Sequence, residues 1–179
     1  MIPQPNPQPW PGPCGQLINK KKVSQIVFDF SATISQQIDE PKYTGTASVN
    51  ITFTRDDSWN CSNPYGSNPP SGTFYDCGTC CGAFDGIEAF ASNVGSWSCT
   101  YDGTDTGGGT WDIYISIYEG SDPNTYAILV RLFPHEGANS CLDDPEAEAN
   151  NIPAADLLSE IDLTGSLDPD NYVFKLTLS

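Results

Sequence analysis

Apolar and polar residues alternate along much of this chain with a period of two, which is the repeat of a β-strand that buries one face. In residues 23–34, VSQIVFDFSATI, one face is apolar and the other carries Gln25, Asp29 and Ser31. Residues 46–54, TASVNITFT, repeat this alternation. Both segments are therefore predicted to be strands.

The same alternation continues towards the C-terminus. Clear strand patterns are WSCTY at 97–101, WDIYISIYE at 111–119, YAILVRLF at 126–133 and YVFKLTL at 172–178, and weaker ones are IEAFAS at 87–92 and a short piece around Phe74. Gly, Asp, Asn and Pro fill the gaps, as in DGTDTGGG and EGSDPNT, which are typical of hairpin or bulge turns. Only PAADLLSEI, at residues 153–161, has the spacing of a short helix.

About seven or eight strands without a sustained helical period predict an all-β protein, an antiparallel β-sandwich of two packed sheets. Its length of 179 residues suits one domain. We divide the chain into a proline-rich extended arm at residues 1–19 and a single sandwich domain at residues 20–179. Two long connections that contain cysteines interrupt the strands, an insertion at residues 55–86 and a loop at residues 134–152.

Charge narrows the possible partners. Seven Lys and Arg against 23 Asp and Glu leave a net charge of −16, which repels nucleic acid and anionic lipid, so we expect neither as a partner. No apolar run approaches the ~20 residues that cross a bilayer, and no positively charged stretch followed by an apolar one opens the chain. We therefore expect neither a transmembrane segment nor a signal peptide.

The first thirteen residues, MIPQPNPQPWPGP, carry proline at every odd position from Pro3 to Pro13. Each proline ring fixes φ and removes a backbone donor, so an extended polyproline II arm is predicted. At ~3.1 Å per residue it spans about 40 Å, enough to reach a neighbouring molecule. The alternative is a terminus without a role. The expected partner-binding residues are Pro3, Pro5, Pro7, Pro9, Trp10, Pro11 and Pro13, with the Trp10 ring as the anchor.

The chain has seven cysteines. The segment CGTCC at residues 77–81 has the spacing of a zinc knuckle, but no second C-x-x-C follows and His135 is the only histidine. Disulfide bonds would account for the same cysteines without requiring four ligands around one ion. A disulfide that closes a loop as long as the insertion at residues 55–86 stabilises the fold by roughly 3 kcal/mol. Disulfides are preferred, and zinc or reduced thiols stay as alternatives. The candidates are Cys61, Cys77, Cys80, Cys81, Cys99 and Cys141. Because seven is odd, at least one thiol is free or bonded between chains, and the candidate is Cys14.

No catalytic motif is present. Ser-His-Asp or Cys-His catalysis would have to use His135, in LFPHEG, and no motif surrounds it. Paired loop acids suit solvated turns better than a calcium site. We therefore predict that the protein is not an enzyme and holds no resident metal or cofactor.

Aromatic residues offer a binding surface instead. Trp59, Tyr65 and Tyr75 lie in or beside the insertion, and Tyr114 and Tyr118 fall on the polar face of their strand. Exposed rings on a β-sandwich stack on sugars and also form protein interfaces. Trp59, Tyr65 and Tyr75 are accordingly the candidate glycan-stacking residues.

The organisation as a whole, and the stretch MIPQPNPQPWPGPCG in particular, resembles small β-rich structural proteins of tailed-phage particles, such as head-decoration, neck or tail components. In these proteins an extended N-terminal arm laces one subunit to another. The resemblance implies a noncatalytic structural subunit of a virus particle or similar extracellular assembly, whose arm binds other copies or capsid or tail proteins. The alternative function is a carbohydrate-binding or adhesion module.

Overall fold

The computed structural model describes residues 20–36, 43–59, 70–77, 86–101, 105–137, 145–165 and 171–179. The strands are β1 (Gln25–Gln36), β2 (Tyr43–Arg55), β3 (Thr73–Cys77), β4 (Gly86–Tyr101), β5 (Asp105–Glu119), β6 (Thr125–Pro134), β7 (Glu146–Pro153), β8 (Glu160–Asp162), β9 (Thr164–Gly165) and β10 (Asn171–Leu178). Three short 3-10 turns accompany them: η1 (Lys20–Lys22), η2 (His135–Gly137) and η3 (Ala154–Asp156). The described part of the chain contains no α-helix, and none of its helical turns could span a membrane.

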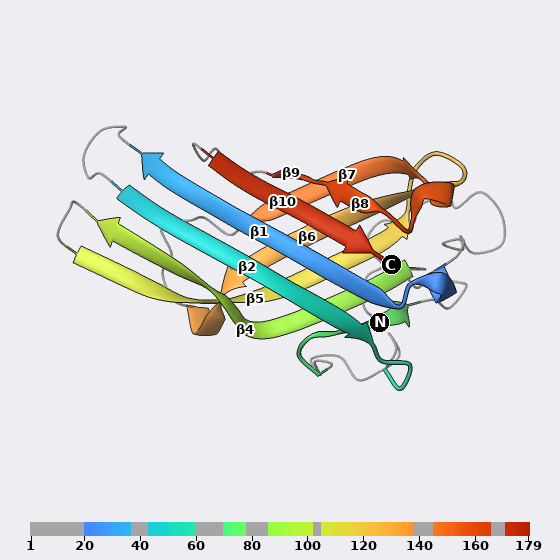
Figure 1. The fold of residues 1–179 in the computed structure, drawn as a ribbon, viewed down its shortest axis with the longest axis horizontal. Coiled ribbons are helices and arrows are strands. Elements are labelled where there is room, and N and C mark those ends of the chain that lie inside the picture. The colour runs from blue at the N-terminus through green and yellow to red at the C-terminus, as the bar shows by residue number, and fades with distance from the viewer. Residues whose placement is uncertain are drawn as a thin grey trace, which may run out of the picture.

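All ten strands belong to one sheet, in the order β8-β10-β1-β2-β3-β4-β5-β6-β7-β9. Neighbouring strands are antiparallel except β2 and β3, which are parallel. The two edge strands, β8 and β9, are separated in the chain only by Leu163, whose amide donates to the carbonyl oxygen of Phe174 on β10 at 2.9 Å. The sheet therefore curls until its edges nearly meet (Figure 1).

This nearly closed barrel confirms the all-β, mostly antiparallel prediction and corrects the expectation of two separate sheets. In Figure 1, β10, β1 and β2 form one side of the flattened barrel, and β5, β6 and β7 lie behind them. Alternation of apolar and polar residues is the same in a sandwich and in a barrel, because both bury one face of every strand. The pattern therefore could not distinguish the two architectures.

The barrel interior is filled by the faces that the alternation predicted. On β1 and β5 the inward side chains are buried, and large rings join the two sides of the barrel. The ring of Phe30 lies 4.6 Å from that of Phe174 and 6.4 Å from that of Trp111, which in turn lies 6.3 Å from that of Trp97. The core is thus one continuous cluster across the barrel.

Strand β4 bends sharply in its middle. The segments predicted at 87–92 and 97–101 are one strand, whose first half pairs with β3 and whose second half pairs with β2. Register shifts mark β-bulges at the bend, where Asn93 and Gly95 have φ of 59° and 64°. A Cβ on Gly95 would lie 2.5 Å from the Ser48 carbonyl oxygen, so only glycine fits there. At the bend β4 changes its partner on one edge from β3 to β2, while it stays paired with β5 on the other.

Three local predictions were wrong. Residues 105–109, part of the expected turn DGTDTGGG, belong to β5, because Gly109 lets the strand approach the Trp97 ring, which a Cβ would meet at 2.9 Å. The helix expected at 153–161 is reduced to η3, because β8 pairs with β10 from Glu160. The loop expected at 134–152 contains β7, which pairs with β6. In each case tertiary pairing overrides local propensity.

Candidate functional site

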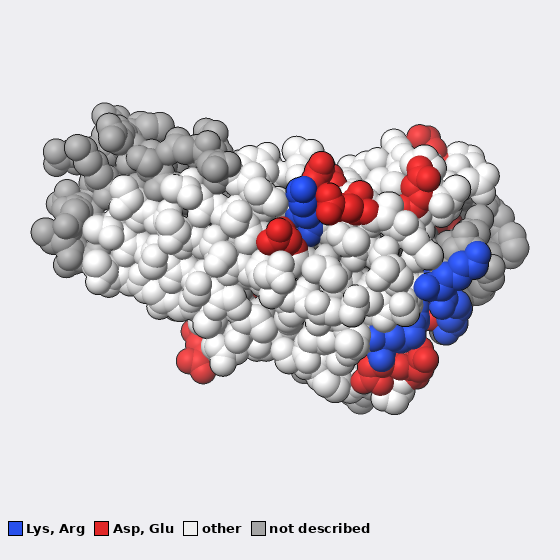
Figure 2. Space-filling view, in the orientation of Figure 1, with Lys and Arg blue, Asp and Glu red and all other residues white. Residues whose placement is uncertain are grey.

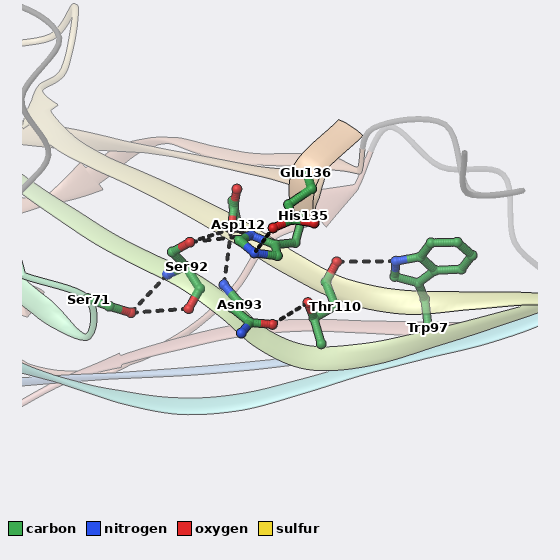
Figure 3. A network of polar contacts seen from close by, with 8 residues as sticks. All are labelled: Ser71, Ser92, Asn93, Trp97, Thr110, Asp112, His135 and Glu136. Atoms are coloured by element: carbon green, nitrogen blue, oxygen red, sulfur yellow. Dashed lines mark hydrogen bonds and ion pairs between the residues drawn. The ribbon is translucent and has the colours of Figure 1, made fainter. Parts of the chain in front are cut away.

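A network of polar side chains holds the bend in β4 and opens onto the outer surface of the barrel (Figure 3). Its centre is Asp112 of β5, whose Oδ1 accepts three hydrogen bonds. The donors are Ser92 Oγ at 2.8 Å, the Asn93 amide at 3.0 Å and His135 Nδ1 at 2.8 Å. Burial works to raise the pKa of Asp112, but these three hydrogen bonds and the imidazole outweigh it and hold that pKa below its usual range.

The network extends to both sides of the bend. Ser71 Oγ accepts from the Ser92 amide at 2.9 Å, and Thr110 Oγ1 donates to Asn93 Oδ1 at 2.7 Å. The Thr110 carbonyl oxygen accepts from the Trp97 indole at 3.2 Å. The left-handed conformation of Asn93 is thereby held through its amide and its side-chain oxygen, which is how a strained bulge residue is retained.

Although serine, histidine and aspartate meet here, their geometry differs from a catalytic relay. In such a relay the serine bonds one imidazole nitrogen and the aspartate bonds the other. Ser92 Oγ lies 3.4 Å from His135 Nδ1, the same nitrogen that contacts Asp112, and His135 Nε2 lies 3.7 Å from Glu136 Oε1. The arrangement braces the bulge and does not activate Ser92 as a nucleophile.

Beside this network lie three rings on the outer face of the sheet, which we call the aromatic ridge: Phe90 of β4, Tyr114 of β5 and Phe133 of β6. Ring centroids are 5.2 Å apart for Phe90 and Tyr114 and 5.8 Å apart for Tyr114 and Phe133. Tyr114 is 41% exposed and Phe133 is 37% exposed, whereas Phe90 is buried and packs against Tyr114. The ridge is therefore an apolar surface open to a partner.

A second aromatic corner brings together two of the predicted glycan-stacking residues. The rings of Trp59 and Tyr75 pack edge to face, with centroids 6.4 Å apart. Tyr75 is opposite Glu88 of β4, and Ser116 Oγ of β5 donates to Glu88 Oε2 at 2.8 Å. Tyr65 lies outside the described residues.

Burial governs the acid–base behaviour of this corner. It raises the pKa of Glu88 from 4.5 to about 7, against the hydrogen bond from Ser116. Burial, followed by the charge of Glu88, also raises the pKa of Tyr75 to about 12, so its hydroxyl stays protonated.

The buried carboxyl of Glu88 predicts a pH-dependent stability. Between about pH 4.5 and 7 the folded state binds more protons than the unfolded state, so the free energy of unfolding falls as pH rises, by about 3 kcal/mol in total. We expect Glu88→Gln to remove this slope and to be more stable than wild type above pH 7. Urea unfolding from pH 4.5 to 8 measures it.

The exposed Glu148 of β7 supplies the matched control, because Glu148→Gln should keep the wild-type slope. If Glu88→Gln followed the wild-type curve at every pH, the buried-acid assignment would be wrong.

The segment that follows residues 1–19 is fastened to one end of the barrel, and we call residues 20–24 the arm root. Arg55 Nη2 donates to the carbonyl oxygens of Lys20 at 2.7 Å and Val23 at 2.6 Å. The amide of Ser24 donates to the carbonyl oxygen of Ser179 at 2.7 Å, so the arm root also meets the C-terminus.

Charge reinforces this fastening. Asp76 of β3 binds Arg55 Nη1 through Oδ1 at 2.7 Å and Lys21 Nζ through Oδ2 at 2.5 Å. Burial works to raise the pKa of Asp76, but Lys21 and Arg55 outweigh it and lower that pKa. Figure 2 shows basic side chains gathered at the end of the barrel where η1 lies, on a front face that carries few charges.

Most cysteines, and the whole arm, lie outside the described residues. Cys99 of β4 is buried in the core and disulfide-bonded. No disulfide joins two cysteine side chains of the described ranges, and no cluster of metal-ligating side chains occurs within them, so the pairing stays a prediction. Of Cys77 the structure describes the backbone alone, as the end of β3. The remaining predicted cysteine and partner-binding sites also lie outside the described residues: Cys14, Cys61, Cys80, Cys81, Cys141, Pro3, Pro5, Pro7, Pro9, Trp10, Pro11 and Pro13.

The sequence analysis did not predict most residues of the aromatic ridge and of the Asp112 network. Phe133 was detectable, because it is out of phase with the buried Val130 and Leu132 on its strand. The contact of Asp112 with Ser92 and His135 had no sequence signal, since it depends on a bulge and on pairing between strands.

The fold and site define a nearly closed all-β barrel with a fastened arm root and an aromatic outer surface. Comparisons of the chain with protein-family models, with curated proteins and with solved structures find no match.

Proposed function

We propose that this chain is a noncatalytic structural subunit of a virus particle or similar extracellular assembly, and that residues 1–19 attach it to neighbouring subunits. The fastened arm root is the observation that carries the proposal. An arm can hold a subunit in place only if its base is fixed to a rigid body. Arg55 fixes the base of this arm through partly buried, charge-assisted hydrogen bonds.

Composition supports the same function. Proline at every odd position of residues 3–13 limits the conformational entropy that binding would cost, which suits a segment that binds in extended form. The partners are other copies or capsid or tail proteins.

Deletion of residues 1–15 tests the proposal. The chain is produced together with the other subunits of its particle, and its amount in purified particles is measured. We expect the deletion to abolish incorporation and to leave the thermal midpoint of the barrel unchanged, because the arm root begins at Lys20.

A variant in which residues 1–15 are replaced by a Gly/Ser segment of equal length is the matched control for length, and it should also fail to incorporate. Normal incorporation of either variant would overturn the arm as the attachment.

A carbohydrate-binding or adhesion module is the second candidate function, and the aromatic corner favours it. The rings of Trp59 and Tyr75 pack together at this corner, and neighbouring aromatic rings on a β-protein are suited to stacking on sugars. Binding of the full chain to a glycan array would be lost in Trp59→Ala and retained in Leu158→Ala, an exposed apolar position elsewhere. Equal binding by both variants, or by neither protein nor variants, removes this candidate.

A further inference from the structure

We propose that the aromatic ridge of one copy is the docking surface for the proline-rich segment, residues 1–13, of a neighbouring copy. The inference rests on the proposed function and names the surface that receives the arm.

Exposure singles out the ridge. Of the large hydrophobic side chains in the described ranges, three are exposed: Tyr114, Phe133 and Leu158. Tyr114 and Phe133 are in ring contact with each other, and Phe90 packs against Tyr114. Adjacent exposed rings gain from being covered, whereas a single exposed leucine is ordinary for a protein surface.

The chemistry of the ridge fits a polyproline segment. Such segments bind surfaces lined with aromatic rings, because proline rings pack on the ring faces and the extended chain is already ordered. Residues 1–13 hold six prolines, and Trp10 adds a further ring.

Hydrogen bonding is complementary as well. Each proline removes a backbone N–H donor but keeps its carbonyl acceptor, so residues 1–13 offer more backbone acceptors than donors and favour a partner that donates. Burial and the charge of Asp112 raise the pKa of Tyr114, so its hydroxyl keeps its proton. Arg131 pairs with Tyr114 across β5 and β6 and adds further N–H donors while its Nε contacts Glu146 Oε2 at 3.1 Å.

The absence of charged side chains in residues 1–19 allows the arm to approach the ridge of an acidic copy. The chain carries a net charge of −16, yet residues 1–19 contain no charged side chain. The acids near the ridge, such as Asp112 and Glu146, therefore do not repel the arm as they would repel an acidic segment. The uncharged arm can therefore contact an acidic copy without electrostatic repulsion.

Length permits docking on a neighbour. At ~3.1 Å per residue, residues 1–19 span about 60 Å in polyproline II form. They start from Lys20, which is held at one end of the barrel. This reach exceeds the diameter of a domain of this size, roughly 30–40 Å.

Complementation between full-length chains tests the proposal. One chain carries Trp10→Ala, which disables the arm, and the other carries Tyr114→Ala with Phe133→Ser, which disables the ridge. Sedimentation at increasing protein concentration, with reductant to exclude bonds through Cys14, measures self-association. We expect each variant alone to lose the association of wild type, and an equimolar mixture to regain part of it, since one chain supplies an arm and the other a ridge.

A direct measurement uses a labelled peptide of residues 1–15, with Cys14→Ser, added to full-length Trp10→Ala protein. We expect binding, and a loss of about tenfold or more in affinity when Tyr114→Ala is added. Leu158→Ala is the matched control and should bind as well as its parent. Circular dichroism confirms folding of each variant.

The ridge assignment is overturned if the ridge variant self-associates like wild type, if no protein self-associates, or if the peptide binds the Tyr114→Ala protein unchanged. It is also overturned if the arm is held by its own barrel, seen as protection of Trp10 that does not depend on concentration. In all these cases loss of particle incorporation on deletion of residues 1–15 would still support the proposed function, so the two can fail separately.

Discussion

Replacement of Trp111 by alanine is expected to lower the free energy of unfolding by about 3–5 kcal/mol, the range for truncating a large buried ring. Trp111 is fully buried and contacts Phe30 and Trp97, so it joins both sides of the barrel. Its indole nitrogen donates to the Ser96 carbonyl oxygen at 3.3 Å, and that oxygen would lose its donor. Removing the ring leaves a cavity that a closed sheet cannot collapse to fill.

Chemical denaturation of wild type and Trp111→Ala measures this difference. The control is Thr52→Ala, an exposed position on β2, which should change stability by less than ~0.5 kcal/mol. A loss below about 1 kcal/mol for Trp111→Ala would show that the ring does not join the two sides as described.

Arg55→Met is expected to lower the free energy of unfolding by about 2–4 kcal/mol, because it removes one partner of a partly buried ion pair. Arg55 is 15% exposed and Asp76 is 12% exposed, and after the change Asp76 keeps only Lys21. The carbonyl oxygens of Lys20 and Val23 also lose their donors. Methionine retains apolar contact with the Phe74 ring, over which the guanidinium lies at 4.9 Å.

Two measurements separate the ion pair from general destabilisation. In Arg55→Met, amide exchange of Val23, which donates to the Lys20 carbonyl oxygen at 3.1 Å, should accelerate more than that of β5. The double variant Arg55→Met with Asp76→Leu should be less destabilised than the sum of the two single variants, since no unpaired carboxylate remains. Additive losses would contradict the pairing.

The local sequence pattern predicted where the strands lie in the chain better than it predicted which strands pair with each other. On β1 the buried side chains Ile26, Phe28 and Phe30 are those that the period of two assigned to the inner face. The same pattern could not reveal that β3 lies parallel to β2, or that β4 changes partner at its bulge. Pairing depends on contacts between residues far apart in sequence, which a local period does not contain.

The residues of the candidate site also fall into those that the sequence predicted and those that depend on strand pairing. Trp59 and Tyr75 were selected as exposed aromatic residues, and they do lie together. Glu88 was not selected, because nothing in IEAFAS shows that its carboxyl is buried beside Tyr75. His135 was considered alone, and its contact with Asp112 exists only because β5 pairs with β6 and because β6 leads directly into η2.

What the sequence alone determined is the all-β class and the inward face of each strong strand, since both follow from the spacing of apolar residues along a local segment. It also determined the proline-rich composition of the arm. Only the tertiary structure decided that the strands form one curled sheet, that Arg55 fastens the arm root, and that Phe90, Tyr114 and Phe133 meet in a ridge. These features depend on which strands become neighbours, and that choice comes from the packing of the whole core.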